Sequence, residues 1–94
     1  MRLGLLLTGG SARENLTTAL QAEAAGFHSA WVVDFFNSNA LVHAAALAAG
    51  TERIEIGTAI ANTFTRSPLV LGNGLLDIDA LSAGRFRAGL GTGR

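Results

Sequence analysis

The sequence has 94 residues, of which 49% are hydrophobic and 15% charged, and its seven basic and seven acidic side chains give a formal net charge of zero. This balance argues against a surface for nucleic acid or anionic membranes, because such surfaces need an excess of basic residues. The absence of cysteine excludes a disulfide framework, a thiolate nucleophile, an iron–sulfur cluster and a cysteine-bound zinc site. All seven basic residues are arginine, so Schiff-base chemistry and the lysine of a P-loop are also excluded.

The chain is more apolar than its length leads one to expect. Its mean hydropathy is +0.36, whereas a small domain has a large surface to cover with polar groups. A membrane span does not explain this value, since the longest apolar stretch, Ala40–Ala49, is interrupted by His43 and is about half of the roughly 20 residues that a span needs. We therefore expect a cytoplasmic chain that either buries apolar surface against a partner or is one part of a larger fold.

The first elements are a strand and a helix. The apolar run Leu3–Leu7 ends in turn residues and predicts a buried strand; a signal peptide is disfavoured because the run is short and lacks a small-residue cleavage site. Next, Ser11 and Glu14 have the spacing of a capping box, and Gly26 stands where a C-terminal helix cap belongs. The apolar residues at helical spacing between them are Leu16, Ala19, Leu20, Ala24 and Phe27.

The middle of the chain continues this alternation. Ala30–Val33 predicts a second strand. An alanine-rich helix is expected at about Asn39–Ala49, starting beside Ser38 and stopping at Gly50. Ile54–Ala61 then predicts a third strand.

The last elements are a helix and a strand. Ser67, followed by proline, is typical of an N-cap with proline at the first helical position, and the helix is expected to end near Gly84. Gly72 and Gly74 within it each cost about 1 kcal/mol relative to alanine, so this helix should depend on close packing against a neighbour. Phe86–Leu90 predicts the fourth strand and completes the order β-α-β-α-β-α-β, which indicates a parallel sheet with right-handed crossovers.

Candidate functional residues follow the strands, because parallel α/β folds place their sites at the carboxyl ends of the strands. These segments combine glycine, small polar side chains, aromatic rings and one carboxylate, which suits a flat, hydrogen-bonding aromatic ligand better than a metal ion. The segments are Thr8–Gly10, Asp34–Asn37, Asn62–Phe64 and Gly91–Arg94. His28 and His43 form no cluster with a carboxylate, so we expect packing or surface roles for them and no metal site.

The glycine-rich segment Gly89–Gly93 is weak evidence by itself. Glycines would let a backbone approach a ligand closely, although Gly89 is expected to pack against the fold. A dinucleotide fingerprint would instead lie in the turn after the first strand. Because Gly9–Arg13 lacks that pattern, a small doubly wound nucleotide-binding domain is a minor alternative.

Several segments together resemble one known family. They are Gly26–Asp34, Gly50–Thr58, Arg66–Pro68, Asp79–Arg85 and Gly89–Gly93. In this order they resemble the N-terminal part of the bacterial luciferase-like superfamily, above all its deazaflavin-dependent, methylenetetrahydromethanopterin reductase-like branch. The resemblance covers nearly the whole chain. Its spacing also implies an ion pair between Asp79 and Arg85 that ties the third helix to the fourth strand.

This resemblance implies an α/β fold that is the N-terminal half of a (β/α)8 TIM barrel, with residues 1–94 as a partial luciferase-like domain containing strands one to four. It implies FMN or the deazaflavin coenzyme F-420 as cofactor, bound at the carboxyl ends of the strands. The implied activity is hydride transfer to or from a small organic substrate, or flavin monooxygenation. The other partners expected are a second copy of the chain or a missing C-terminal half, with neither nucleic acid nor membrane.

The resemblance also suggests which residues contact the cofactor, while no catalytic residue is assigned. Asp34 matches an acidic residue near the cofactor ring; from its position alone it is a site residue or a helix N-cap, and we favour the site. Phe35 stands where many relatives have a histidine that handles a proton, so a binding or stacking role is expected instead. A non-prolyl cis peptide is implied between Ala59 and Ile60. The remaining cofactor contacts implied are Asn62, Thr63, Phe64, Gly91, Thr92 and Gly93.

Two classes of function remain from the sequence. The first is part of a flavin- or deazaflavin-dependent oxidoreductase, inactive as the isolated chain because a complete barrel needs about 250 residues and commonly binds phosphate after strands seven and eight. The alternative is a non-catalytic half-barrel whose open sheet edges pair with another copy or with a separate half.

Overall fold

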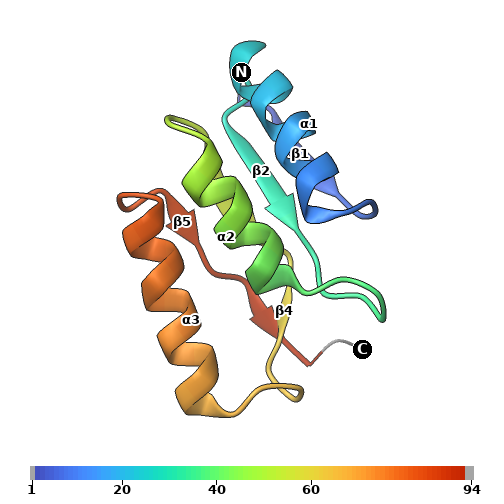
Figure 1. Ribbon diagram of the computed structural model, residues 1–94, viewed down its shortest axis with the longest axis vertical. Helices are drawn as coiled ribbons and strands as arrows, with labels where there is room; N and C mark the ends of the chain where they lie inside the picture. Colours follow the sequence, from blue (N-terminus) through green and yellow to red (C-terminus); the bar gives the residue numbers. More distant parts are fainter. Residues whose placement is uncertain (1, 93–94) are drawn as a thin grey trace.

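The computed structural model describes residues 2–92, which form a parallel β-sheet and three α-helices (Figure 1). In chain order the elements are β1 (Gly4–Leu7), α1 (Ala12–Ala24), β2 (Ser29–Val32), α2 (Ala40–Gly50), β3 (Glu55–Thr58), β4 (Ala61–Asn62), α3 (Pro68–Leu81), β5 (Phe86–Arg87) and β6 (Leu90–Gly91). Within this described range, none of the helices is long and apolar enough to cross a membrane.

The main sheet has the sequential strand order β1-β2-β3-β5, and every pair in it is parallel. With right-handed crossovers, a sequential order places all connecting helices on one face of the sheet. Figure 1 shows α1, α2 and α3 side by side in front of the strands. A doubly wound domain reverses its strand order and carries helices on both faces, so the minor alternative of a nucleotide-binding domain is wrong.

The hydrophobic core lies between the helices and the sheet. One row of paired residues, Leu5, Ala30, Ile56 and Phe86, runs across all four strands. This row packs with Leu47 of α2, which is fully buried, in a single apolar cluster. Alternation of side chains along a strand then sends the neighbouring row to the opposite face.

That opposite face is not covered by any helix of the described residues. Its central row contains Leu6, Trp31 and Gly57, and the Trp31 ring lies where a side chain on Gly57 would be. Leu6 is 54% exposed. The prediction of a buried first strand is therefore wrong in part: β1 forms, but it is an edge strand with one face open.

The predicted start of each helix and the cap at Gly26 are confirmed, whereas α2 extends through Gly50 and α3 ends at Leu81, before Gly84. In α1, the Ser11 amide donates to Glu14 Oε1 at 2.7 Å and the Glu14 amide donates to Ser11 Oγ at 3.1 Å, which completes the capping box. Gly26 has φ +89° just beyond the helix, the left-handed conformation that favours glycine. The other two helices begin after Asn39 and Ser67. The side chain of each residue accepts a hydrogen bond from a backbone amide in the first turn of its helix.

Close packing of α3 is confirmed at one of its two glycines. A Cβ on Gly74 would lie 2.9 Å from Leu41 Cδ1, so this glycine lets α3 approach α2. A Cβ on Gly72 would meet nothing within 4 Å. The prediction of a tight neighbour therefore holds for Gly74 and is wrong for Gly72.

The third and fourth predicted strands are each interrupted. Ile54–Ala61 gives β3 and β4, and Phe86–Leu90 gives β5 and the start of β6. At the break, the Thr58 hydroxyl replaces part of the backbone ladder: Oγ1 donates to the Gly89 carbonyl and accepts from the Gly89 amide, both at 2.9 Å. Beyond it, β4 and β6 pair as a separate parallel ribbon.

Arg85 does not pair with Asp79, so the ion pair implied by the resemblance is wrong. Its guanidinium instead donates to carbonyl oxygens of Ala48, Thr51 and Ile54, at 2.8–3.0 Å. The chain turns at the end of α3 in a way that points Arg85 towards the C-terminal end of α2, where unpaired helix carbonyls attract a cation. The residue thus ties the α3–β5 turn to the α2–β3 loop.

Glu23 of α1 fixes the loop before β3. Its Oε2 accepts from three successive backbone amides, those of Glu52 at 3.0 Å, Arg53 at 2.6 Å and Ile54 at 3.0 Å. Burial raises the pKa of Glu23, but these hydrogen bonds and the charge of Arg53 lower it by more, so the pKa lies below its ordinary value. The folded state therefore favours the ionised carboxylate.

Replacing Glu23 with glutamine should reduce the free energy of unfolding at pH 7 by about 1 kcal/mol, because a charged acceptor of three amides becomes a neutral one. Since the folded pKa is lowered, the contribution of Glu23 is present above the unfolded pKa of about 4.3 and is lost as the pH falls through the folded pKa. Urea denaturation at several pH values tests this.

Glu52→Gln, on an exposed side chain of the same loop, is the control and should change the free energy of unfolding little. Equal losses in the two variants would contradict the role assigned to Glu23.

Candidate functional site

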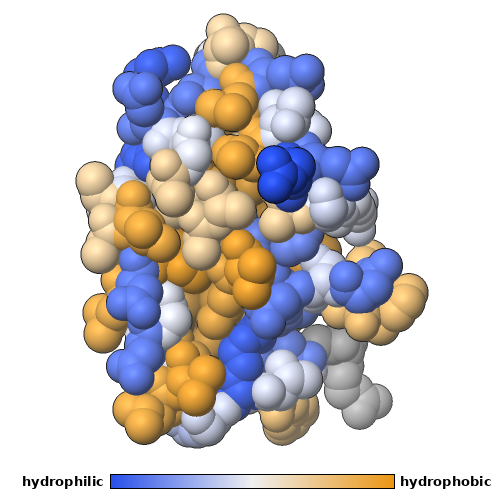
Figure 2. Space-filling view, in the orientation of Figure 1, coloured by the Kyte–Doolittle hydropathy of each residue, from blue (hydrophilic) through white to orange (hydrophobic). Residues whose placement is uncertain are grey.

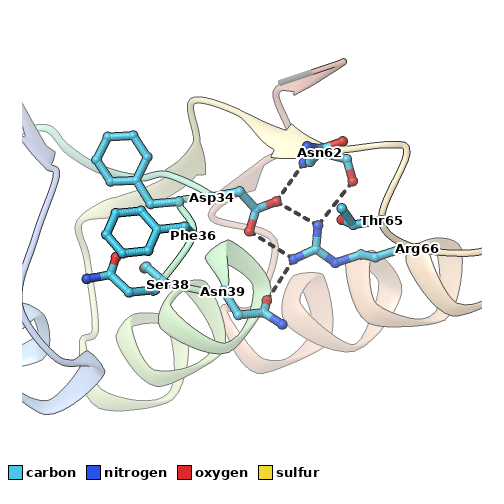
Figure 3. Close-up of a pocket in the computed structure, with 9 residues that line it drawn as sticks. Asp34, Phe36, Ser38, Asn39, Asn62, Thr65 and Arg66 are labelled. Atoms are coloured by element: carbon cyan, nitrogen blue, oxygen red, sulfur yellow. Dashed lines mark hydrogen bonds and ion pairs between the residues drawn. The ribbon is translucent and has the colours of Figure 1, made fainter. Parts of the chain in front are cut away.

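The carboxyl ends of β2, β3 and β4 bring together polar side chains that are far apart in the sequence. Asp34 follows β2, Asn62 ends β4, and Arg66 lies just before α3. Figure 3 shows the Asp34 carboxylate directed at Arg66 and Asn62 rather than at Phe36. These segments therefore meet at the carboxyl edge of the sheet, and the proposed role of their residues in a site stays a prediction.

Asp34 is the centre of this cluster. Its Oδ1 accepts from the Ala40 amide at 2.6 Å, and its Oδ2 accepts from the Asn62 amide at 2.6 Å. The Arg66 guanidinium donates to both oxygens, at 2.6 Å to Oδ2 and 3.0 Å to Oδ1. Because Ala40 is the first residue of α2, the carboxylate takes part in capping that helix as well as in the cluster at the strand ends.

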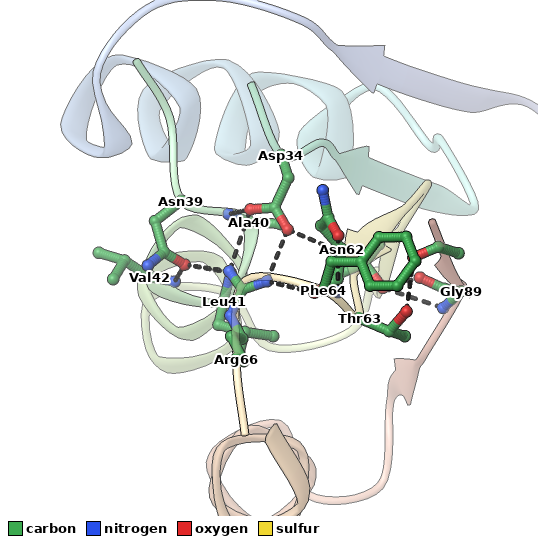
Figure 4. Close-up of polar contacts among 12 residues, drawn as sticks. Asp34, Asn39, Ala40, Leu41, Val42, Asn62, Thr63, Phe64, Arg66 and Gly89 are labelled. Atoms are coloured by element: carbon green, nitrogen blue, oxygen red, sulfur yellow. Dashed lines mark hydrogen bonds and ion pairs between the residues drawn. The ribbon is translucent and has the colours of Figure 1, made fainter. Parts of the chain in front are cut away.

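Arg66 is the residue that sequence reasoning did not assign to the site. Besides Asp34, it donates to the Asn62 carbonyl at 3.1 Å and to Asn39 Oδ1 at 2.7 Å. Figure 4 shows it between the start of α2 and the loop after β4. The available signal was an arginine directly before the N-cap of the third helix, together with a single carboxylate after the second strand.

Asp34 and Arg66 stabilise each other's charged forms. Burial raises the pKa of Asp34, but the hydrogen bonds from Arg66, Ala40 and Asn62 and the charge of Arg66 lower it by more, so the carboxyl pKa lies below its ordinary value. The hydrogen bond to Asp34 raises the pKa of Arg66. Both groups are thus charged at neutral pH, and Asp34 is poorly suited to exchange a proton there.

The loop between β3 and α3 contains the cis peptide bond implied by the resemblance, between Ala59 and Ile60. The Ile60 carbonyl accepts from the Asp34 amide at 3.2 Å, and its side chain is 36% exposed. Three residues further, the Thr63 amide donates to the Gly91 carbonyl at 2.9 Å. The loop is therefore fixed on both sides, to the end of β2 and to β6.

Gly89, just before β6, and Gly91 within it allow close packing of the backbone. A Cβ on Gly89 would collide with the Thr58 carbonyl, which confirms its expected packing role, and a Cβ on Gly91 would collide with the Ile60 side chain. Thr92 is exposed. Gly93 lies outside the described residues. The proposed contact of these residues with a cofactor stays a prediction.

A hollow of about 730 Å³ opens beside the cluster. Its wall includes Asp34, Arg66 and Asn62 together with Phe35 and Phe36. The two rings are 57% and 98% exposed, so a ligand in the hollow would meet both apolar rings and amide groups.

The histidines have the packing and surface roles expected of them. His43 is buried, and its Nδ1 lies 2.9 Å from Asn15 Nδ2 of the neighbouring helix. His28 lies 3.4 Å from a Glu55 carboxylate oxygen at the opposite end of the sheet. Among residues 2–92, no group of three histidine or acidic side chains could hold a metal ion.

The groups in and around β4, from Ile60 to Phe64, fit a flat, uncharged ring. Ile60 and Phe64 present partly or largely exposed apolar surface, while Asn62 and Thr63 add amide and hydroxyl groups on the same segment. Arg66 is held by Asp34 and is not free to pair with a phosphate. This set of residues therefore suits the ring of a flavin or deazaflavin better than its phosphate tail.

Comparison with known proteins gives a consistent result. The family model described as luciferase-like monooxygenase matches residues 2–94. The 5,10-methylenetetrahydromethanopterin reductase of Methanopyrus kandleri is 37% identical over 73 residues, which are 77% of this chain and 21% of that protein. The coenzyme F-420-dependent glucose-6-phosphate dehydrogenase of Kineococcus radiotolerans is 33% identical over 85 residues, 80% of this chain and 25% of that protein.

Solved structures show the same fold. The coenzyme F-420-dependent tetrahydromethanopterin reductase of Methanopyrus kandleri superposes with a TM-score of 0.88 at 28% identity, covering 99% of this chain and 27% of that one. The oxygenating constituent of 3,6-diketocamphane monooxygenase from Pseudomonas putida, solved with FMN, gives 0.87 at 23% identity, covering 100% of this chain and 30% of that one. The latter likeness concerns the fold alone.

These matches settle the fold class and the family. The expected parallel α/β fold of a TIM barrel is confirmed, and the barrel is partial in this chain. The chain spans only 21% to 30% of the length of the proteins compared. Because the family model covers all but the first residue, the chain belongs to the luciferase-like monooxygenase family.

Proposed function

We propose that residues 1–94 are the part of a TIM-barrel oxidoreductase that contains its strands one to four, and that this part contributes to binding of coenzyme F-420 or FMN. The observation that carries the proposal is the rim formed by the cis Ala59–Ile60 segment and the loop after it, where Ile60 and Phe64 are exposed beside polar groups of Asn62 and Thr63. The names of the relatives, two of which include coenzyme F-420, support a deazaflavin or flavin as the ligand.

When bound, either cofactor would supply hydride transfer, and FMN could instead supply the oxygen activation needed for monooxygenation. The residues of this chain would provide the binding surface: Ile60 and Phe64 against the ring, and Asn62 and Thr63 at its edge. The organic substrate would then lie towards the hollow lined by Phe35 and Phe36. Phenylalanine cannot carry a proton, so in this proposal Phe35 contributes contact surface only.

A second candidate is association without catalysis, and the exposed apolar side chains favour it. Figure 2 shows such side chains gathered over α2 and α3. They are Val42, Leu69, Val70, Leu76 and Leu81. In addition, β1 and β5 have no neighbour on their outer edges among the described residues. Surfaces of this kind are typical of contacts with a second copy or a separate half of the barrel.

Titration of the purified chain with FMN and with coenzyme F-420, followed by fluorescence, separates the two candidates. We expect weak binding of one cofactor, loosened several-fold by Phe64→Ala, which removes an exposed ring at the rim. Leu76→Ala is the matched control, since it truncates an exposed apolar side chain on α3 and should leave the affinity unchanged. Absence of binding together with a sedimentation coefficient larger than that of a 9.7 kDa monomer would favour association instead.

A further inference from the structure

We propose that Asp34 and Arg66, together with Asn39, are positioning residues: they hold β4, and through it the loop that follows, in the form that faces the cofactor, and they do not contact the cofactor themselves. The inference rests on the proposed function for what the loop binds. It replaces the expectation that Asp34 itself is a cofactor contact, and it assigns a role to Arg66 and Asn39.

The acceptor capacity of Asp34 is the first argument. A carboxylate offers about four acceptor sites, and each Asp34 oxygen already takes one backbone amide and one guanidinium N–H. The Asp34 and Arg66 side chains are only 15% and 9% exposed. A ligand group would therefore have to displace a charge-assisted hydrogen bond in order to reach the carboxylate.

The second argument is the number of segments that Arg66 joins. Its guanidinium contacts Asp34 after β2, the Asn62 carbonyl at the end of β4, and the Asn39 side chain. Asn39 in turn caps α2, accepting from the Leu41 amide at 3.0 Å. One half-buried arginine therefore connects the ends of two strands with the start of a helix.

The third argument is what these contacts do to the loop. Asn62 is held through both backbone groups, since its amide donates to Asp34 and its carbonyl accepts from Arg66. The Ile60 carbonyl is held by the Asp34 amide. The Asp34–Arg66 side-chain pair thus fixes the backbone at Asn62, and the main chain of Asp34 fixes it at Ile60. This is the stretch that presents Ile60 and leads to Phe64 at the rim.

Amide hydrogen exchange of the ¹⁵N-labelled chain tests the positioning role without any cofactor. In Arg66→Met, we expect the Asn62 amide to exchange about tenfold faster, because its acceptor loses the partner that holds it in place. Arg66→Lys, which keeps the positive charge, should retain part of the protection of the Asn62 amide. Arg13→Met, on an exposed α1 side chain, should have no effect, and the Ile56 amide in the core sheet should stay protected in every variant that remains folded.

The exchanged pair Asp34→Arg with Arg66→Asp distinguishes positioning from a simple ion pair. Attraction is restored in this double variant, but an arginine at position 34 cannot accept the Ala40 and Asn62 amides. We therefore expect Asn62 to remain fast-exchanging. Recovery of Asn62 protection in the exchanged pair would overturn the inference, and so would normal protection of Asn62 in Arg66→Met.

FMN titration of the same variants tests the link to the cofactor. If the wild-type chain binds FMN, Arg66→Met should raise the Kd about tenfold while Arg13→Met leaves it unchanged; a loosened loop with unchanged FMN affinity would overturn the link. If the wild-type chain binds neither FMN nor coenzyme F-420, the proposed function fails, whereas the exchange rates still decide whether Asp34 and Arg66 position the loop.

Discussion

Gly89→Ala should lower the free energy of unfolding by about 3 kcal/mol, the upper end of the usual cost of overpacking. An added Cβ would collide with the Thr58 carbonyl, which is backbone and cannot turn aside like a side chain. The shift needed would also disturb both hydrogen bonds between Gly89 and the Thr58 hydroxyl, and the bond from the Ala61 amide to the Gly89 carbonyl at 2.8 Å. Urea denaturation followed by circular dichroism measures the loss.

Gly72→Ala is the matched control for this prediction. It adds the same methyl group to a glycine inside α3 that has nothing within 4 Å of the new atom. Alanine favours a helix interior over glycine by about 1 kcal/mol, so this variant should be more stable than the wild type. Similar effects of the two substitutions would show that the break between β5 and β6 does not depend on close contact at Gly89.

Features that depend on local sequence could be predicted well. The capping box of Ser11 and Glu14, the cap at Gly26 and the proline start of α3 involve residues within a few positions of each other. The alternation of these helices with apolar runs then indicates a parallel sheet with right-handed crossovers, whereas the strand order that places the helices on one face comes from the structure. These elements agree with the structure because each signal lies within the element that it defines.

Features that depend on contacts between distant segments could not be predicted from pattern alone. The breaks in the third and fourth strands depend on Thr58 and Gly89, which are 31 positions apart. Within the candidate site, Asp34 and Arg66 are separated by 32 positions. The carboxyl ends of strands indicated where Asp34 would lie, but nothing local to Arg66 showed that its guanidinium turns back to that carboxylate. The cis bond at Ala59 came from the resemblance rather than from the residues themselves.

Arg85→Met should also cost about 3 kcal/mol of unfolding free energy. The side chain makes five hydrogen bonds, all to oxygen atoms. Methionine has a similar length and no donor, so the carbonyls of Ala48, Thr51 and Ile54 would lose their charged partner in a partly buried place. Each buried acceptor left without a partner costs about 1–3 kcal/mol, and water that reaches some of these carbonyls offsets part of this cost. Thermal or urea denaturation of the variant measures the effect.

Two comparisons decide what Arg85 does. Arg87→Met removes the same group two residues further along the chain, in β5, where the side chain is 53% exposed and pairs with Glu55 at 3.4 Å, and it should cost less than about 1 kcal/mol. Asp79→Asn should be close to neutral, because the Asp79 side chain is not the partner of Arg85. If Asp79→Asn destabilised the chain as much as Arg85→Met, an ion pair between helix and strand would be the anchor. A large loss in Arg85→Met alone instead means that the guanidinium stabilises the fold by capping the end of α2 and joining it to the turn before β5.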